Sequence, residues 1–251
     1  MAAEGKAIDA LHQFELTPVF GALGESVRFS QSNAFMLIAV GLISLLMIYG
    51  MAQRAIVPGR LQALAETFYD FAHDLVVSQV GEEGKRFFPF VFSLFMFVLF
   101  GNLLGLLPFA FTFTSHIAVT FALAAIVFVL ITVVGIAIHG THWFSYFFPE
   151  GAPKALAPVI IPIEIISYLS RPISLSVRLF ANMVAGHVML KVFATFVVMI
   201  GSLGAVGYFG AVLPLVMNVA LIGFELLVAF LQAYVFAILT SIYLHDAVHL
   251  H

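Results

Sequence analysis

Charged residues leave four long gaps in the chain, and these gaps constrain its fold more than any other feature. No Asp, Glu, Lys or Arg occurs at positions 29–53, 87–149, 192–224 or 226–245. Each gap matches or exceeds the roughly 20 residues that a helix needs to cross a bilayer. The chain as a whole is 63% apolar and 9% charged, whereas soluble proteins average about 45–50% and about 25%. A soluble globular fold is therefore excluded.

Several functional classes are excluded by composition and motifs. The chain has no cysteine, so it cannot form a disulfide scaffold, an iron–sulfur cluster or a thiolate zinc site. The net charge is −3 and the basic residues are scattered, so the sequence shows no basic patch of the kind that binds nucleic acid. Neither a Walker loop nor a dinucleotide fingerprint occurs. We therefore expect no cofactor and no catalytic centre in this chain, and any ATP chemistry must belong to a partner.

The apolar stretches predict an all-α integral membrane protein with about five membrane-crossing helices. Strict apolar–polar alternation, which marks a membrane β-strand, is absent, and an open sheet leaves its backbone unsatisfied in lipid. In a single membrane domain we expect an N-terminal segment that is not a signal peptide, a spanning helix, an amphipathic interfacial helix, a helical hairpin broken at Pro108, and a long tilted hairpin. In that order they occupy residues 1–32, 33–52, 58–82, 88–139 and 155–245.

The interfacial helix is predicted from apolar residues that recur every three or four positions from Leu61 to Val76, with Glu66, Asp70 and Asp74 opposite. This pattern is typical of a helix that lies in the membrane interface or beneath a partner. Its polar face is more acidic than basic, so a protein partner explains it better than anionic lipid does. A solvated face over residues buried within the chain is an equal alternative.

The last hundred residues are too long for two simple crossings. The helical pattern from Leu156 to Phe196, with only Pro162 and Pro172 as interruptions, would be about 60 Å long, twice the bilayer core. We therefore expect these helices to be strongly tilted, broken, or both. Five basic residues on one side against two on the other predict an N-terminus outside the membrane and a C-terminus inside.

Polar and ionisable residues occur within these two helices, where each charge is costly and usually marks an ion path. They are Glu164, Arg171, Asn182, Arg178, His187, Lys191, Asn218, Glu225 and Gln232. Snorkelling to the headgroups is an alternative for Arg171, Lys191 and Glu164. Arg178 and Glu225 lie deep in apolar sequence, where snorkelling is a poor explanation.

Helical phase sorts these residues into two polar stripes. Glu164, Arg171 and Arg178 are spaced by seven and share one stripe, and so do Asn218, Glu225 and Gln232 on the last helix. In a straight helix His187 would point away from Arg178. The pKa values of histidine and glutamate bracket the pH range in which protons move readily, whereas arginine stays charged. The pattern indicates a relay through His187 and Glu225, with Arg178 as a fixed barrier.

Three segments resemble subunit a of F-type ATP synthases, and the likeness covers the chain from residue 33 onward. They read PISLSVRLFANMVAG at 172–186, GNLLGLLP at 101–108 and LLVAFLQAYVFAILTSIYL at 226–244. The resemblance implies a proton-channel stator subunit that lies against a ring of c subunits and binds lipid and peripheral-stalk b-type subunits, with the catalytic head as an indirect partner. It implies a bacterial inner membrane, with the mitochondrial inner membrane as an alternative.

The resemblance also implies roles for individual residues. Arg178 is the stator arginine, which attracts each ring carboxylate and prevents protons from passing directly between two half-channels. The outer half-channel takes Asn182, His187, Glu225 and Gln232, and the inner one takes Glu164 with Ser167 and Tyr243. Many relatives carry an acid at the position of His187 and a histidine at that of Glu225. This exchanged pair is similar to the mitochondrial type, and which member is the main proton acceptor stays open.

Two other functions fit the sequence less well. A stand-alone proton-coupled transporter is disfavoured by five crossings without an internal repeat, and a purely structural subunit predicts that Arg178 and Glu225 tolerate neutral replacement.

The terminal His245, His249 and His251 suggest a metal site less well than a frayed, solvated tail. Asn102, inside an apolar span, is expected to form a helix–helix hydrogen bond.

Overall fold

A computed structural model describes residues 30–52, 57–107, 110–148 and 156–249, and within these ranges the chain is almost entirely helical. The helices are α1 (Gln31–Ala52), α2 (Arg60–Val80), α3 (Phe88–Gly105), α4 (Ile117–His139), α5 (Ala157–Gly201) and α6 (Ala205–Val248), with 3-10 segments η2 (Glu82–Arg86), η3 (Phe113–Ser115) and η4 (Gly140–Phe147). Five helices, all except α2, are long and apolar enough to span a membrane. The predicted all-α membrane fold is confirmed.

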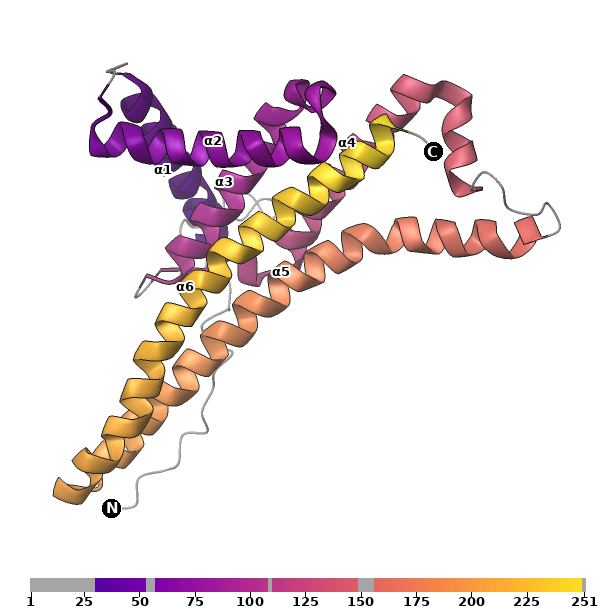
Figure 1. Cartoon of the computed structure of the whole chain (residues 1–251). Coiled ribbons are helices and arrows are strands. Elements are labelled where there is room, and N and C mark those ends of the chain that lie inside the picture. Colours follow the sequence, from indigo (N-terminus) through magenta and orange to yellow (C-terminus); the bar gives the residue numbers. More distant parts are fainter. Residues whose placement is uncertain (1–29, 53–56, 108–109, 149–155, 250–251) are drawn as a thin grey trace, which may run out of the picture.

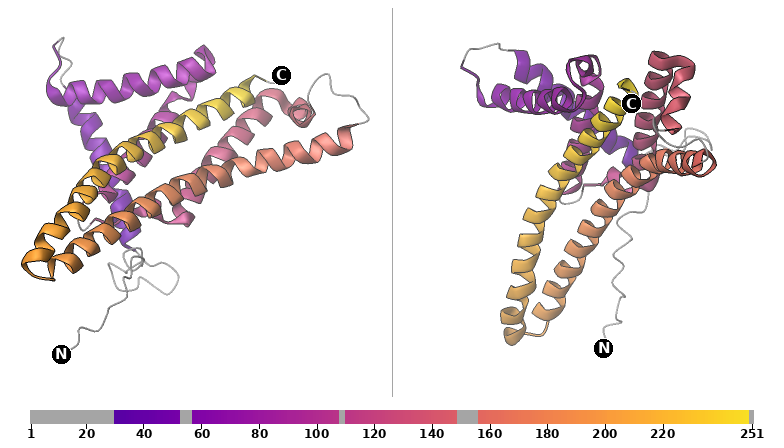
Figure 2. Two further views of the ribbon diagram at one scale, coloured as in Figure 1. Left: turned by 60° about the horizontal axis from the view of Figure 1, so that its bottom comes forward. Right: turned by 45° about the vertical axis from the view of Figure 1, so that its right-hand side comes forward.

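The two long helices, α5 and α6, form an antiparallel hairpin that crosses the other helices obliquely (Figures 1 and 2). They contain 45 and 44 residues, so each is about 67 Å long. The chain reverses at Gly204, whose φ of +85° favours glycine. Neither Pro162 nor Pro172 breaks α5. Instead, α5 curves away from α6 in the half that contains both prolines, as Figure 1 shows.

The centre of the bundle is α3, which packs against α1, α2 and α6. Phe95, Met96 and Leu99 are almost completely buried there. Asn102 is also buried, and its Nδ2 donates to the backbone oxygen of Ala229 on α6 at 3.2 Å. The helix–helix hydrogen bond predicted for Asn102 is therefore confirmed, and it fixes α3 against the middle of the long hairpin.

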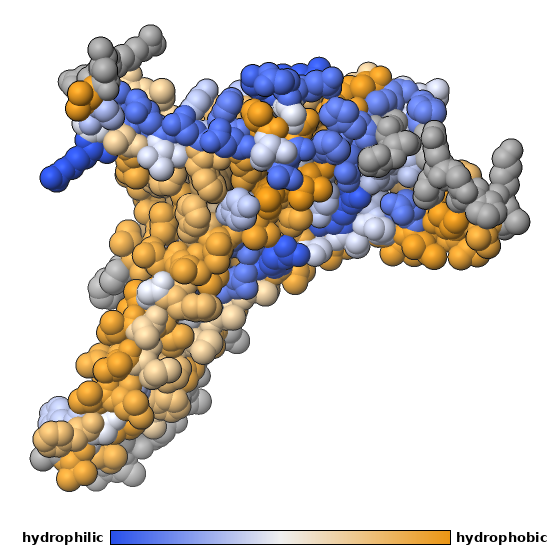
Figure 3. Space-filling model, viewed as in Figure 1, coloured by the Kyte–Doolittle hydropathy of each residue, from blue (hydrophilic) through white to orange (hydrophobic). Residues whose placement is uncertain are grey.

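The amphipathic helix α2 lies across one end of the bundle (Figure 1), and hydrophilic residues gather on that side of the molecule (Figure 3). Ala65, Ala72 and Val76 are buried against the rest of the chain, whereas Leu61 and Leu64 are about half exposed. The apolar face is therefore divided: its later turns pack within the chain, and its first turn is open.

The connection from α3 to α4 is more than a simple turn. Its described part contains η3, whose Phe113, Thr114 and Ser115 are all buried. A Cβ on Gly101 would collide with the Phe113 ring, and a Cβ on Gly105 would collide with the Thr112 side chain. The two glycines of the GNLLGLLP segment therefore let this connection pack directly onto α3.

Candidate functional site

Polar residues of α5 and α6 meet at the interface between these two helices. Asn182 Nδ2 donates to Gln232 Oε1 at 2.8 Å, and His187 Nε2 lies 3.8 Å from Glu225 Oε1. Glu225 and Gln232 are each only 3% exposed. The antiparallel packing thus brings together groups that the sequence places 38 to 50 residues apart.

Of the polar groups between α5 and α6, the Glu225 carboxyl group has the largest desolvation cost when it is ionised. Both of its carboxylate oxygens are buried without a hydrogen-bond partner in the part of the chain that the structure describes. A buried carboxyl group without partners has a large desolvation penalty when it is ionised. Such a group is stable at membrane depth only if it is protonated, reached by water, or close to a cation, and each of these conditions fits a group that exchanges a proton.

A pocket opens beside Glu225 between the two helices. Its volume is about 350 Å³, and its polar lining residues are Asn182, Glu225 and Gln232, with apolar walls formed by residues such as Met189 and Phe224. A single water needs only about 10–15 Å³ of such space. The pocket is therefore large enough for several waters that could hydrate the buried amides and the carboxyl group.

Gly186 is the reason that Glu225 can lie flat against α5. A Cβ at this position would stand 2.6 Å from Glu225 Oε1. The colliding atom is the end of a flexible side chain, so we expect Gly186→Ala to displace the carboxyl group without unfolding the hairpin. The amount of protein in the membrane should stay normal, while any process that needs proton exchange at Glu225 should slow.

The matched control is Gly223→Ala, because no atom lies within 4 Å of a Cβ placed on Gly223 of α6. The assay is proton movement across membrane vesicles that contain the protein. Equal proton movement in the Gly186 and Gly223 variants would contradict a functional position for the Glu225 carboxyl group.

Arg178 lies on α5 one helical turn before Asn182. Its side chain is exposed, and it makes no hydrogen bond or ion pair within the described residues. Leu175, Leu179 and Met183 anchor the opposite side of the helix, where all three are buried. An unpaired guanidinium at membrane depth costs about 2.5–3.5 kcal/mol or more, so this exposed position suits a partner that carries negative charge.

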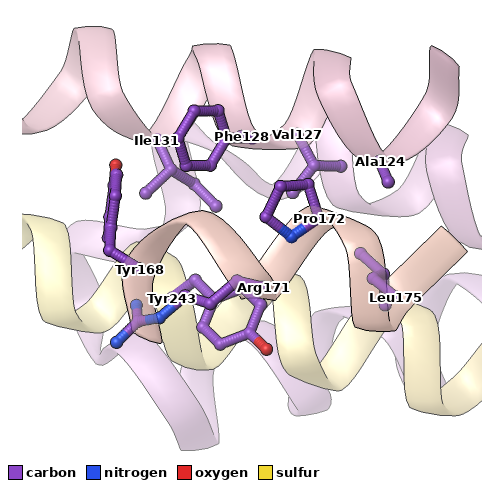
Figure 4. Close-up of a pocket in the computed structure, with 9 residues that line it drawn as sticks. All are labelled: Ala124, Val127, Phe128, Ile131, Tyr168, Arg171, Pro172, Leu175 and Tyr243. Carbon is purple, nitrogen blue, oxygen red and sulfur yellow. The ribbon is translucent and has the colours of Figure 1, made fainter. Parts of the chain in front are cut away.

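Arg171, seven residues before Arg178 on α5, differs from it in being paired and largely buried. Its Nη1 lies 3.2 Å from Asp246 Oδ2 on α6, and its Nη2 donates to the hydroxyl of Tyr146 in η4. Its guanidinium also lies 4.7 Å from the centre of the Tyr243 ring, beside which Figure 4 draws it. These contacts explain the position of Arg171 better than snorkelling to the headgroups does.

The end of the chain corrects another expectation, because α6 continues to Val248 instead of fraying. Asp246 is therefore held in a helix, where it pairs with Arg171. The rings of His245 and His249 stack with centroids 4.7 Å apart, while His251 lies outside the described residues. No group of three possible ligands forms a metal site among the residues that the structure describes.

Neither Tyr146 nor Asp246 was predicted to contact Arg171. Burial raises the pKa of Tyr146, although the nearby Arg171 guanidinium opposes the shift. The phenol is therefore neutral at physiological pH, and its oxygen accepts the arginine hydrogen bond. The available signal was the aromatic run around Tyr146, but sequence alone does not show which basic residue it faces.

The other predicted residues lie along the same hairpin without joining one cluster. Glu164 is half-buried, Ser167 is exposed, and Tyr243 is half-buried beside Arg171. No hydrogen bond joins these three to one another within the described ranges. Asn218 is half-buried, and its Oδ1 is buried without a hydrogen-bond partner among the described residues. Two small cavities of about 10 Å³ border Arg171 and Tyr243, each large enough for about one water.

Comparison with known proteins gives a consistent result. Residues 33–245 match the family model described as ATP synthase A chain. The chain is 64% identical to ATP synthase subunit a of Granulibacter bethesdensis over the full length of both proteins. It is 58% identical to the subunit a of Acidiphilium cryptum, with 99% of this chain and 100% of that protein aligned. Identity to the Rhodopseudomonas palustris BisB18 protein is 54%, with 96% and 98% aligned.

Proposed function

The chain belongs to the ATP synthase A chain family, and from this premise we propose that it is the proton-translocating stator subunit of an F-type ATP synthase. It is an integral membrane subunit of the ATP synthase membrane sector and is not itself catalytic. The single observation that carries the proposal is the buried Glu225 carboxyl group, which lies beside His187 and borders a pocket between the two long helices.

The outer half-channel, in this proposal, consists of Asn182, His187, Glu225 and Gln232, with Asn218 farther toward the hairpin turn. The pocket beside Glu225 admits water, and the Asn182–Gln232 hydrogen bond holds two amides along its wall. A proton enters through this water, passes between His187 and Glu225, and leaves to a carboxylate on the partner ring. Supporting this, the cluster contains two proton-exchanging groups close together at membrane depth.

The inner half-channel is proposed to use Glu164, Ser167 and Tyr243. Glu164 and Ser167 lie on the N-terminal half of α5, where that helix curves away from α6 (Figure 1). The splayed helices and the small cavities near Tyr243 support access for water from this side. A ring carboxylate that has lost its proton here would next meet Arg178.

Arg178 is proposed to separate the two half-channels. Its exposed guanidinium attracts the deprotonated carboxylate of the ring, and it blocks proton transfer because arginine does not lose its proton. The attraction has to be transient, since a buried ion pair of ideal geometry would not release the ring. A surface position next to a moving partner satisfies this requirement better than a buried one would.

The partners follow from the same arrangement. We assign the c-ring to the exposed surface of the long hairpin, the b-type subunits to the other helices, and the catalytic head to indirect contact through them. Apolar residues cover the far part of the hairpin (Figure 3), with Phe209, Leu213 and Phe224 highly exposed. We place the complex in a bacterial inner membrane, with the N-terminus outside and the C-terminus in the cytoplasm.

The test is proton uptake by vesicles that contain the assembled complex after the catalytic head has been stripped. Glu225→Gln keeps the shape of the side chain but removes its proton exchange, so potential-driven uptake should fall roughly tenfold or more. Glu66→Gln is the matched control, because Glu66 lies on α2 and pairs with Gln62 at 2.7 Å. Unchanged uptake in Glu225→Gln would favour a purely structural subunit.

A further inference from the structure

We propose that Thr112, in the connection between α3 and α4, is a positioning residue of the outer half-channel that holds the His187 imidazole within reach of Glu225. This inference rests on the function proposed above and deepens it. It adds to the proton path a residue from outside the α5–α6 hairpin, which the polar stripes of those two helices could not indicate.

The geometry around one ring nitrogen carries the inference. His187 Nε2 lies 2.9 Å from Thr112 Oγ1, and the same nitrogen lies 3.8 Å from Glu225 Oε1. The first distance is that of a hydrogen bond, and the second is too long for one. His187 Nε2 is therefore held by the threonine hydroxyl while it stands next to the buried carboxyl group.

The threonine hydroxyl has a second partner, which makes it useful in both protonation states of the imidazole. Thr112 Oγ1 lies 3.3 Å from the backbone oxygen of Gly105. When Nε2 carries a proton, it donates to Oγ1, and the hydroxyl proton points to Gly105. When Nε2 has lost its proton, the hydroxyl rotates and donates to the bare nitrogen.

The proton step is balanced. In the imidazolium form the Nε2–H turns from Thr112 Oγ1 to Glu225 when the carboxyl group closes the 3.8 Å gap to hydrogen-bond distance. The Nε2–H bond of His187 then breaks and an O–H bond forms on Glu225 Oε1, so the positive ring and the negative carboxylate are neutralised together. Thr112 neither gains nor loses a proton in this step. After the proton has left, the Thr112 hydroxyl donates a hydrogen bond to His187 Nε2. This bond matters because an unpaired polar atom is costly in a buried place.

Packing and a backbone hydrogen bond fix the position of the Thr112 side chain. Its side chain is packed against Gly105, where a Cβ would collide with it, and only 5% of the residue is exposed. Its backbone oxygen accepts a hydrogen bond from Ser115 Oγ at 2.6 Å. The hydroxyl therefore has a fixed position relative to α3, and it transfers that position to a histidine on α5.

The surrounding connection is unusually polar for a buried segment. Thr114 Oγ1 and His116 Nε2 are both buried without a hydrogen-bond partner among the described residues. Burial also lowers the pKa of His116, so this second imidazole is neutral at physiological pH. Unpaired polar atoms of this kind commonly hold ordered water, which suits a segment at the entrance of a water-filled path.

The test compares two substitutions that differ in one hydroxyl group. Thr112→Val keeps the branched shape and removes the hydroxyl, whereas Thr112→Ser keeps the hydroxyl. Potential-driven proton uptake by head-stripped vesicles should fall roughly tenfold in Thr112→Val, as when a hydrogen-bonded partner of a functional imidazole is lost. Thr112→Ser should restore most of the uptake.

The control for the loss of a buried threonine hydroxyl is Thr240→Val, because Thr240 Oγ1 donates to the backbone oxygen of Phe236 on its own helix. Uptake is compared at equal amounts of assembled complex, so a folding defect does not count as loss of conduction. Wild-type uptake in Thr112→Val, or equal loss in the valine and serine variants, would overturn the inference. The proposed function would still stand if Glu225→Gln lost uptake in the same vesicles.

Discussion

Replacing Arg178 with alanine is expected to make the membrane sector permeable to protons while abolishing coupled ATP synthesis. The side chain is exposed on α5, outside the His187–Glu225 cluster, and has no ion pair within the described part of the chain. Its positive charge is therefore available to a ring carboxylate. Without that charge nothing holds the carboxylate in its ionised form as it passes, and nothing blocks proton transfer between the half-channels.

The measurement is passive proton uptake by head-stripped vesicles, with and without a reagent that modifies the ring carboxylate. Uptake that is raised in Arg178→Ala and blocked by the reagent would place the leak at the subunit–ring interface. Arg86→Ala is the matched control, because Arg86 lies in η2, where its guanidinium stacks on the Phe87 ring. A proton-tight Arg178→Ala vesicle with normal ATP-driven pumping would exclude the barrier role.

Periodicity predicted much of this arrangement because two packed helices present their stripes to each other. The spacing of Glu225 and Gln232 on α6 indicated one polar face, and that face does meet Asn182 and His187 of α5. A seven-residue repeat drifts by only about 20° on a straight helix. The pattern is therefore dependable over one or two steps, provided that the helix does not bend.

The same rule does not predict which members of a stripe are covered along the curved helix α5. Arg171 is one step of seven from Arg178, yet one is paired with Asp246 and the other is exposed. The curvature follows the part of α5 that contains two prolines, and no local pattern specifies its direction. Thr112 was missed for another reason: it lies in a short connection without periodicity, and its neighbour His187 is 75 residues away.

The pair formed by Arg171 and Asp246 is expected to hold the N-terminal half of α5 to the end of α6. Besides the 3.2 Å contact between them, Arg171 donates to Tyr146 and lies over the rings of Tyr168 and Tyr243. The side chains of Arg171 and Asp246 are only 19% and 27% exposed. Removing either charge leaves the other in a poorly hydrated place, so each single change should destabilise the subunit.

A double-mutant cycle separates this coupling from the loss of packing. Arg171→Gln should cost on the order of 3 kcal/mol, since it removes charged hydrogen bonds and ring contacts, and Asp246→Asn should cost less, because the rings still cover the guanidinium. The double variant should be little worse than Arg171→Gln, since the unpaired carboxylate that contributes to its cost is gone. Thermal unfolding of the detergent-solubilised complex measures each term. Strictly additive costs would mean that the two charges do not act together, and the curved half of α5 would then depend on Tyr168 and its neighbours for its position.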